Sequence, residues 1–182
     1  MVKTRNFRDD DFKPVAQAIG EVVLAWNDLH QVLGILFWFT VGIKNALVPF
    51  AVWHSSKVDR AQREMLQALV DLEALGLDIR KDVRGEFRWL LKEINKLEDH
   101  RNNAVHSLLM KGDEDVAAGA HQFGHQRAKR LADKDPLREF QWLYDSIVTV
   151  RDHSAALINC VRDAQHPLPE RLKMPSRGDS NQ

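Results

Sequence analysis

The stretch from Phe12 to Thr40, FKPVAQAIGEVVLAWNDLHQVLGILFWFT, decides the fold. Its apolar residues recur at alternating intervals of three and four, which is the period of an α-helix with one buried face. The acidic run Asp9–Asp11 before it suits a helix N-terminus, and Gly42 after it suits a helix end. The stretch therefore predicts one long helix, with a buried face comprising Phe12, Val15, Ile19, Val22, Trp26, Leu29, Leu33, Leu36 and Thr40.

Three further stretches carry the same spacing. We expect a second helical stretch over 46–75 with a bend at 54–56, a third helix over 79–110, and a fourth that begins at Pro136. Amphipathic helices joined mostly by short connections pack side by side around one core. The pattern therefore predicts an all-α fold, namely an up-and-down four-helix bundle.

Two segments lie outside this pattern. Residues 111–135 hold three of the nine glycines and no apolar stripe, so we expect a mobile surface excursion between the third and fourth helices. Residues 166–182 hold three of the six prolines, and we expect a disordered tail there. The helical bundle is therefore assigned to residues 1–165, and no run alternates as a strand would.

Composition limits the classes of function and the compartment. With 26 basic and 26 acidic residues, the chain has no bulk charge that would attract nucleic acid, so RNA binding would need a local patch. Cys160 is the only cysteine, which excludes an intrachain disulfide and a Cys-rich zinc site. Residues 1–11 lack a signal-peptide core, and the apolar run from Val32 to Ile43 is shorter than the roughly twenty residues of a membrane span. We expect a cytoplasmic protein with no membrane contact.

The first two helical stretches carry more aromatic surface than four helices would normally hide. The apolar stretch from Val32 to Phe39 in particular exceeds what one bundle buries comfortably. A homodimer interface would cover such a surface. We therefore expect a homodimer that uses aromatic residues from the set Trp26, Phe37, Trp38, Phe39, Phe50 and Trp53.

Arg101 interrupts the apolar seam of the third helix. Leu97 lies one turn before it and Ala104 one turn after it. A guanidinium stays charged and costs several kcal/mol to desolvate without a partner. Arg101 must therefore pair with an acid, reach water, or line a wet cleft. Asn102 and His106 follow it on the same helix, and Arg101 and His106 are about 140° apart around an ideal helix.

The string Arg101-Asn102, followed by His106 after four intervening residues, resembles the motif of the HEPN superfamily. That family places an Arg, a polar residue and a His late in a helix of an α-bundle. The resemblance covers about 150 residues in architecture and six in sequence. The chain departs from the family after the His, where it has Ser107 and Leu108 instead of Gly or a basic residue.

The resemblance implies a metal-independent endoribonuclease, often a toxin or defence effector, whose site forms where two protomers juxtapose their motifs. It implies Arg101, Asn102 and His106 as catalytic residues, single-stranded RNA as substrate, and products with 2′,3′-cyclic phosphates. It also implies a cognate antitoxin or regulatory protein as a partner. The side chains suit this chemistry, because a His transfers protons near neutral pH and an Arg presents a charged fork to phosphate. No metal and no cofactor are needed.

Two other functions remain open. One is a non-catalytic HEPN-like bundle that serves as an RNA-binding or protein-interaction scaffold, with the same three residues structural. The other is an interaction module unrelated to nucleic acid. Under both of these functions, Arg101 would occupy its seam position simply as a structural residue paired with a carboxylate.

Other polar clusters carry weaker signals. Lys57 and Arg60, with Arg63, form a basic stretch that is a solvated helix face by default and that could hold an RNA backbone. His121 and His125 are interpreted as solvated loop residues. The Glu-x-x-His pairs of a di-iron bundle are absent, and Asp152-His153-Ser154 lacks the context of a hydrolase nucleophile.

Overall fold

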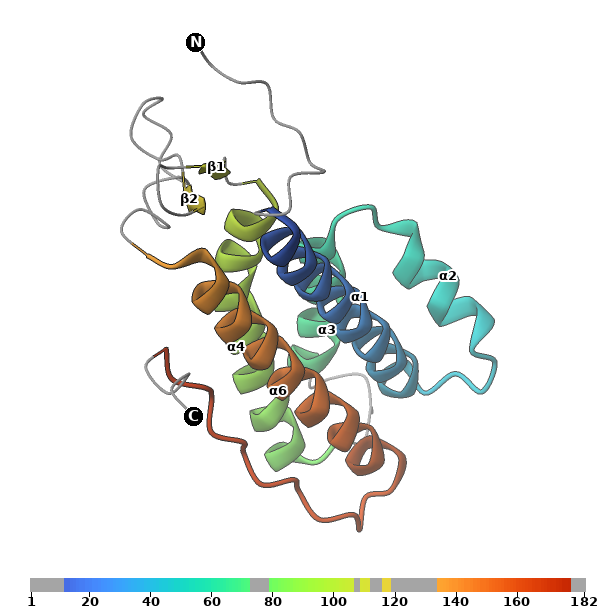
Figure 1. Cartoon of the computed structure of the whole chain (residues 1–182). Helices are drawn as coiled ribbons and strands as arrows, with labels where there is room; N and C mark the ends of the chain where they lie inside the picture. The colour runs from blue at the N-terminus through green and yellow to red at the C-terminus, as the bar shows by residue number, and fades with distance from the viewer. Residues whose placement is uncertain (1–11, 73–78, 107–108, 112–115, 119–133, 178–182) are drawn as a thin grey trace.

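The computed structural model describes residues 12–72, 79–106, 109–111, 116–118 and 134–177. Helices form most of this part of the chain, which confirms the prediction of an all-α fold (Figure 1). The described residues contain five helices: α1 (Lys13–Val41), α2 (Leu47–Ser55), α3 (Asp59–Asp71), α4 (Lys81–His106) and α6 (Pro136–Arg162).

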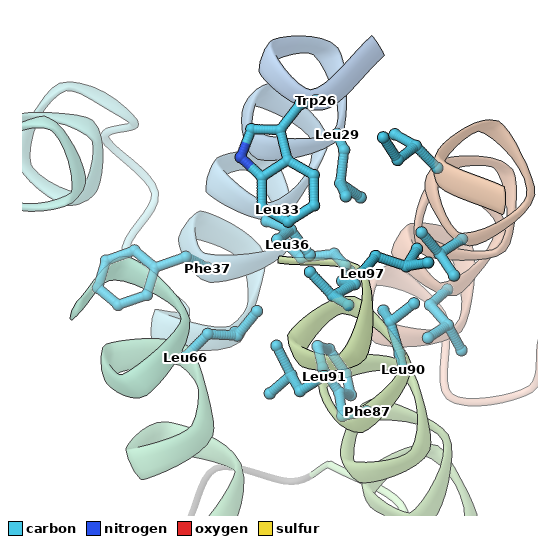
Figure 2. Packing of buried hydrophobic residues seen from close by; sticks show 14 of the residues in the cluster. Trp26, Leu29, Leu33, Leu36, Phe37, Leu66, Phe87, Leu90, Leu91 and Leu97 are labelled. Carbon is cyan, nitrogen blue, oxygen red and sulfur yellow. The ribbon is translucent and has the colours of Figure 1, made fainter. Parts of the chain in front are cut away.

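The long helix α1 is in contact with every other helix of the described chain. Its most extensive contact is with α6, and α4 packs in turn against α6 and α3 (Figure 1). By length and apolar composition alone α1 could also cross a membrane, a test that core helices of soluble proteins pass as well. Figure 2 shows the core, where apolar side chains of α1 meet those of α3 and α4: Trp26, Leu29, Leu33, Leu36, Leu66, Phe87, Leu90, Leu91 and Leu97.

The second predicted helical stretch is two helices, so the predicted bend at 54–56 is a break. Ser56 and Val58 are extended, with φ/ψ of −76°/128° and −124°/120°. The Ser55 hydroxyl donates to the backbone oxygen of Val52 at 2.7 Å, and serine hydroxyls that bond the backbone in this way compete with the helical pattern. Leu75, the predicted end of this stretch, lies outside the described residues.

A glycine lets α2 pack closely against α1. A Cβ at Gly34 would lie 3.0 Å from Nε1 of Trp53, which is tighter than nine in ten real Cβ contacts. Trp53 is 1% exposed and stacks at a tilt on Phe37, with 5.4 Å between ring centres. The contact buries the inner side of α2, and its outer side stays exposed.

The third predicted helix ends at His106 and does not reach residue 110. Leu109–Lys111 forms a strand, β1, that pairs antiparallel with β2 (Val116–Ala118) in the register Leu109↔Ala118. The expectation of no strand was therefore wrong at this point, because three-residue strands are too short to show alternation. The rest of the predicted excursion, including His121 and His125, lies outside the described residues apart from Lys134 and Asp135.

The prediction of a disordered tail from residue 166 was wrong for residues 166–177. The C-terminal segment, residues 163–177, lies in extended conformation along α4 and α6 (Figure 1). Arg171 donates twice to Glu86 of α4, with Nη2 2.9 Å from Oε1 and Nε 3.0 Å from Oε2. Trp142 of α6 donates to the backbone oxygen of Pro175 at 2.9 Å. These bonds and the ring contacts of two arginines offset the cost of ordering a proline-rich chain.

Candidate functional site

Arg101 lies on the buried seam of α4, as its sequence position predicts. Leu97 and Ala104, its seam neighbours, are 3% and 1% exposed, and Arg101 itself is half-buried. Its Nη1 donates to Oδ1 of Asn102 at 3.1 Å, and its Nε is buried without a hydrogen-bond partner. Its Cζ lies 5.8 Å from the ring centre of Trp26. Within the described chain, Arg101 forms no ion pair.

Trp26 connects three helices at this point. It comes from α1 and is 1% exposed. Its Nε1 donates to Oδ2 of Asp59, at the start of α3, at 2.8 Å. Its ring centre is 5.3 Å from that of His30 and 5.6 Å from Cζ of Arg63. We call the residues joined around this ring the Trp26 cluster: Trp26, His30, Asp59, Gln62, Arg63, Asn95, Glu98 and Arg101.

Arg63 is buried in this cluster, which corrects its assignment to a solvated basic face. It is 2% exposed, and it contacts two polar side chains of α4. Nε donates to Oδ1 of Asn95 at 2.8 Å, and Nη2 lies 2.9 Å from Oε2 of Glu98. Burial lowers the pKa of Arg63 from its ordinary value, while Glu98 opposes that shift. The arginine is thus a paired structural cation.

The hydrogen bonds around His30 fix its tautomer. Its Nε2 lies 3.2 Å from Nη1 of Arg63, and because a guanidinium only donates, Nε2 must accept. The proton is then on Nδ1, which donates to Oε1 of Gln62 at 3.1 Å. Gln62 in turn donates to the backbone oxygen of Trp53 at 3.1 Å. Burial lowers the pKa of His30 below 6.5, which favours the neutral ring that this chain of bonds requires.

The other predicted site residues lie at the edge of the cluster. Arg60 is exposed on α3, with Nε 3.9 Å from Oε2 of Glu98 and 4.0 Å from Oε1 of Glu64. Glu98 precedes Arg101 by one turn of α4, so the structure brings Arg60 close to the motif. Lys57 is exposed in the bend before α3.

His106 is exposed as the last residue of α4. It makes no hydrogen bond or ion pair with the described part of the chain. Within one protomer, no contact of these kinds links His106 to Arg101. Asn103, between them, is 3% exposed, and its Nδ2 has no hydrogen-bond partner. The structure joins Arg101 to Asn102 by a hydrogen bond and places Arg60 near Glu98, one turn before Arg101, whereas His106 and Lys57 have no such contact with the described residues.

The sequence contains signals for the cluster residues that the motif does not include. Arg63 precedes Leu66 by three residues and Val70 by seven, so it shares their buried stripe on α3. His30 follows Trp26 by four residues and shares its face of α1. A polar residue on an apolar stripe was recognised at Arg101 and overlooked at these two positions.

The chain matches no protein-family model, no curated protein and no solved structure. The resemblance to the HEPN superfamily therefore stays a prediction. Within the residues the structure describes, no group of three or more His, Cys, Asp or Glu side chains is placed to hold a metal ion.

Proposed function

We propose that this protein is a metal-independent endoribonuclease of HEPN type, which cleaves single-stranded RNA at a site shared by two copies of the chain. The proposal needs no cofactor, and the products carry 2′,3′-cyclic phosphates. A toxin or defence effector with a cognate antitoxin or regulatory protein is the biological role that goes with it. The cytoplasm is the expected compartment.

The observation that carries the proposal is the state of Arg101. The nearby carboxylates of the cluster have other partners, since Asp59 accepts from Trp26 and Glu98 pairs with Arg63. Arg101 is a half-buried cation with no ion pair among the described residues and with an unused Nε. An anion that binds from solvent would stabilise such a cation, and a phosphate matches the planar fork of a guanidinium.

The motif residues then take separate roles. Arg101 donates to the non-bridging oxygens of the scissile phosphate and stabilises the charge that develops in the pentacoordinate transition state. His106 removes the proton of the 2′-hydroxyl as its oxygen attacks the phosphorus, and it returns a proton to the 5′ oxygen that leaves. Asn102, which accepts from Arg101 at 3.1 Å, keeps the guanidinium at the surface of α4. Arg60 and Lys57 attract the RNA backbone on either side.

A second copy completes the site, because Arg101 and His106 leave α4 in different directions. Residues 32–39 were predicted to form the dimer contact, but Leu33, Leu36 and Phe37 of this stretch are buried within one chain. The exposed apolar surface lies mainly on and beside α2 instead, at Ile43, Leu47, Val48, Val52 and Val58. No charged residue occurs from position 45 to position 56, so two such faces can meet without burying an ion. The bend after α2 leads directly to Asp59 of the Trp26 cluster.

The test is incubation of the pure protein with generic single-stranded RNA in excess EDTA. We expect cleavage by the wild-type protein and none by His106→Ala, with RNA binding nearly unchanged. His166→Ala is the matched control, because His166 lies in the C-terminal segment, away from both the motif and α2, and alanine keeps the backbone oxygen that accepts from Arg80. Cleavage that survives in His106→Ala, or that EDTA abolishes, would contradict the proposal.

The second candidate is a non-catalytic bundle that binds RNA or a protein partner. The exposed apolar face of α2 favours it, because such a face also suits a different protein. In that case the wild-type protein binds RNA or its partner without cutting, and His106→Ala behaves as the wild type does.

A further inference from the structure

One indole lies beside both arginines on the inner side of the site. The ring centre of Trp26 is 5.6 Å from Cζ of Arg63 and 5.8 Å from Cζ of Arg101. At such distances a guanidinium is attracted by the ring, and the attraction is stronger where water is excluded. Trp26 is 1% exposed.

The two arginines differ in what else holds them. Arg63 bonds Asn95 and His30 and pairs with Glu98, so three side chains keep it in place without the indole. Among the described residues, Arg101 has one hydrogen bond, to the half-buried side chain of its neighbour Asn102, and its Nε has no partner there. Loss of the Trp26 ring would therefore leave Arg63 anchored and Arg101 free to change rotamer.

Trp26 itself is held by a bond across two helices. Its Nε1 donates to Oδ2 of Asp59 at 2.8 Å, which ties the indole of α1 to the first turn of α3. The ring cannot turn away without leaving this N–H unsatisfied in a buried place, and such a loss is unfavourable. Asp59 thus fixes the orientation of the Trp26 ring beside which the Arg101 guanidinium lies.

We infer that Trp26 is a positioning residue for Arg101, and that Asp59 holds the Trp26 ring in the orientation this requires. The kinetic consequence rests on the proposed function, because Arg101 acts on the phosphate and Trp26 acts through Arg101. A guanidinium already in place loses less conformational freedom when the transition state forms. The contribution of Trp26 therefore belongs mainly to kcat and less to KM.

Two substitutions and one control test this inference by kinetics. Trp26→Phe keeps an aromatic ring and loses the bond to Asp59, and Asp59→Asn weakens that bond with little change in volume. The control is Trp89→Phe, because Trp89 also lies beside an arginine, Arg171, at 5.2 Å. We expect kcat/KM to fall about tenfold in Trp26→Phe, to fall less in Asp59→Asn, and to stay unchanged in the control.

A second measurement does not depend on cleavage. Nitrogen NMR of arginine side chains reports the exchange of each Nε–H with water, and the Arg101 signal is assigned by its loss in Arg101→Lys. In Trp26→Phe and in Asp59→Asn we expect faster exchange at Arg101 and an unchanged signal from Arg63. A purely structural role for Trp26 would not separate these two arginines.

The outcomes distinguish this inference from the proposed function. Wild-type exchange at Arg101 in both variants overturns the inference, and so does loss of the Arg63 and Arg101 signals together in both. A wild-type protein that cleaves no RNA overturns the proposed function, and the NMR comparison then decides alone whether Trp26 positions Arg101. Cleavage by the wild type with unchanged kcat/KM in Trp26→Phe leaves the function standing and removes the positioning role.

Discussion

Arg63 and Arg101 lie beside the same indole, yet their surroundings differ. Arg63 is 2% exposed and has a carboxylate, an amide and an imidazole as partners. Arg101 is half-buried and bonds the amide of its neighbour. A buried charge tolerates desolvation only when its partners compensate for lost water, so Arg63 belongs to the fold, while the proposed function assigns Arg101 to the surface that meets RNA.

Leucine substitution should separate the two roles. Arg63→Leu leaves Glu98 without its close cation and His30 without a donor, so we expect the free energy of unfolding to fall by about 3 kcal/mol. Arg101→Leu removes a charge with no ion pair among the described residues, and we expect a change within about 1 kcal/mol of zero. Urea denaturation measures both. Strong destabilisation by Arg101→Leu would instead identify Arg101 as a structural residue.

Two buried histidines should make stability depend on pH. Burial lowers the pKa of His30 and of His153 below 6.5, so as the pH falls each takes up its proton later in the folded protein than in the unfolded chain. The free energy of unfolding should therefore be level above pH 6.5 and fall below it, by up to about 1.4 kcal/mol per pH unit for each histidine. His30→Gln should have a shallower slope. Equal slopes in the variant and the wild type would contradict the neutral assignment of His30.

At the scale of the elements, apolar spacing predicted the helices well where they pack on one side. The stripe of α1 predicted both its position and its buried face, and the fourth helix begins at Pro136, as predicted. The break between α2 and α3 was underestimated, because it depends on serine–backbone bonds and on the contact of Trp53 with Gly34, which spacing does not reveal. Of the candidate site, the motif stays a prediction, and the buried partners of Arg63 were not predicted, because they come from two other helices, α1 and α4.

The outer face of α2 should be the contact between two copies. Val48 and Val52 are four apart on this helix and are 52% and 45% exposed. The double variant Val48→Glu/Val52→Glu places like charges in a twofold contact, and we expect dimerisation at least ~100-fold weaker with the helical circular dichroism retained. Leu24→Glu is the control, since Leu24 is 70% exposed on α1. Analytical ultracentrifugation measures the dimerisation of each variant. A wild-type protein that is monomeric at micromolar concentration would rule out the shared site.

At the scale of the whole molecule, the charges balance, with 26 of each sign. A protein of this kind gains little from long-range attraction to RNA, so the proposed RNA binding has to depend on the few cations beside the site. The proposed function assigns three of them to phosphates in each copy, namely Lys57, Arg60 and Arg101. Arg60 also lies near Glu98 and Glu64, and RNA has to compete with these carboxylates.

The salt dependence of RNA binding should reflect this small number. For three phosphate contacts from each of the two copies on a single strand, the logarithm of the affinity should fall against the logarithm of salt concentration with a slope of about −4. Lys57→Ala with Arg60→Ala should reduce that slope by more than half. Fluorescence anisotropy with a short labelled RNA measures it, using His106→Ala so that the RNA stays intact. A much steeper slope would show that cations outside the described site dominate.

The C-terminal segment has a consequence for how the protein is made. Glu86 is 9% exposed in the finished fold, and the guanidinium that neutralises it, that of Arg171, is translated 85 residues later. On the ribosome, α4 and α6 are therefore synthesised before the arginine that covers the carboxylate between them. In the finished fold His153 lies 3.3 Å from this carboxylate, and a nascent chain that ends before Arg171 lacks the guanidinium that pairs with it. Emergence of Arg171 from the exit tunnel is thus the step that completes this side of the bundle.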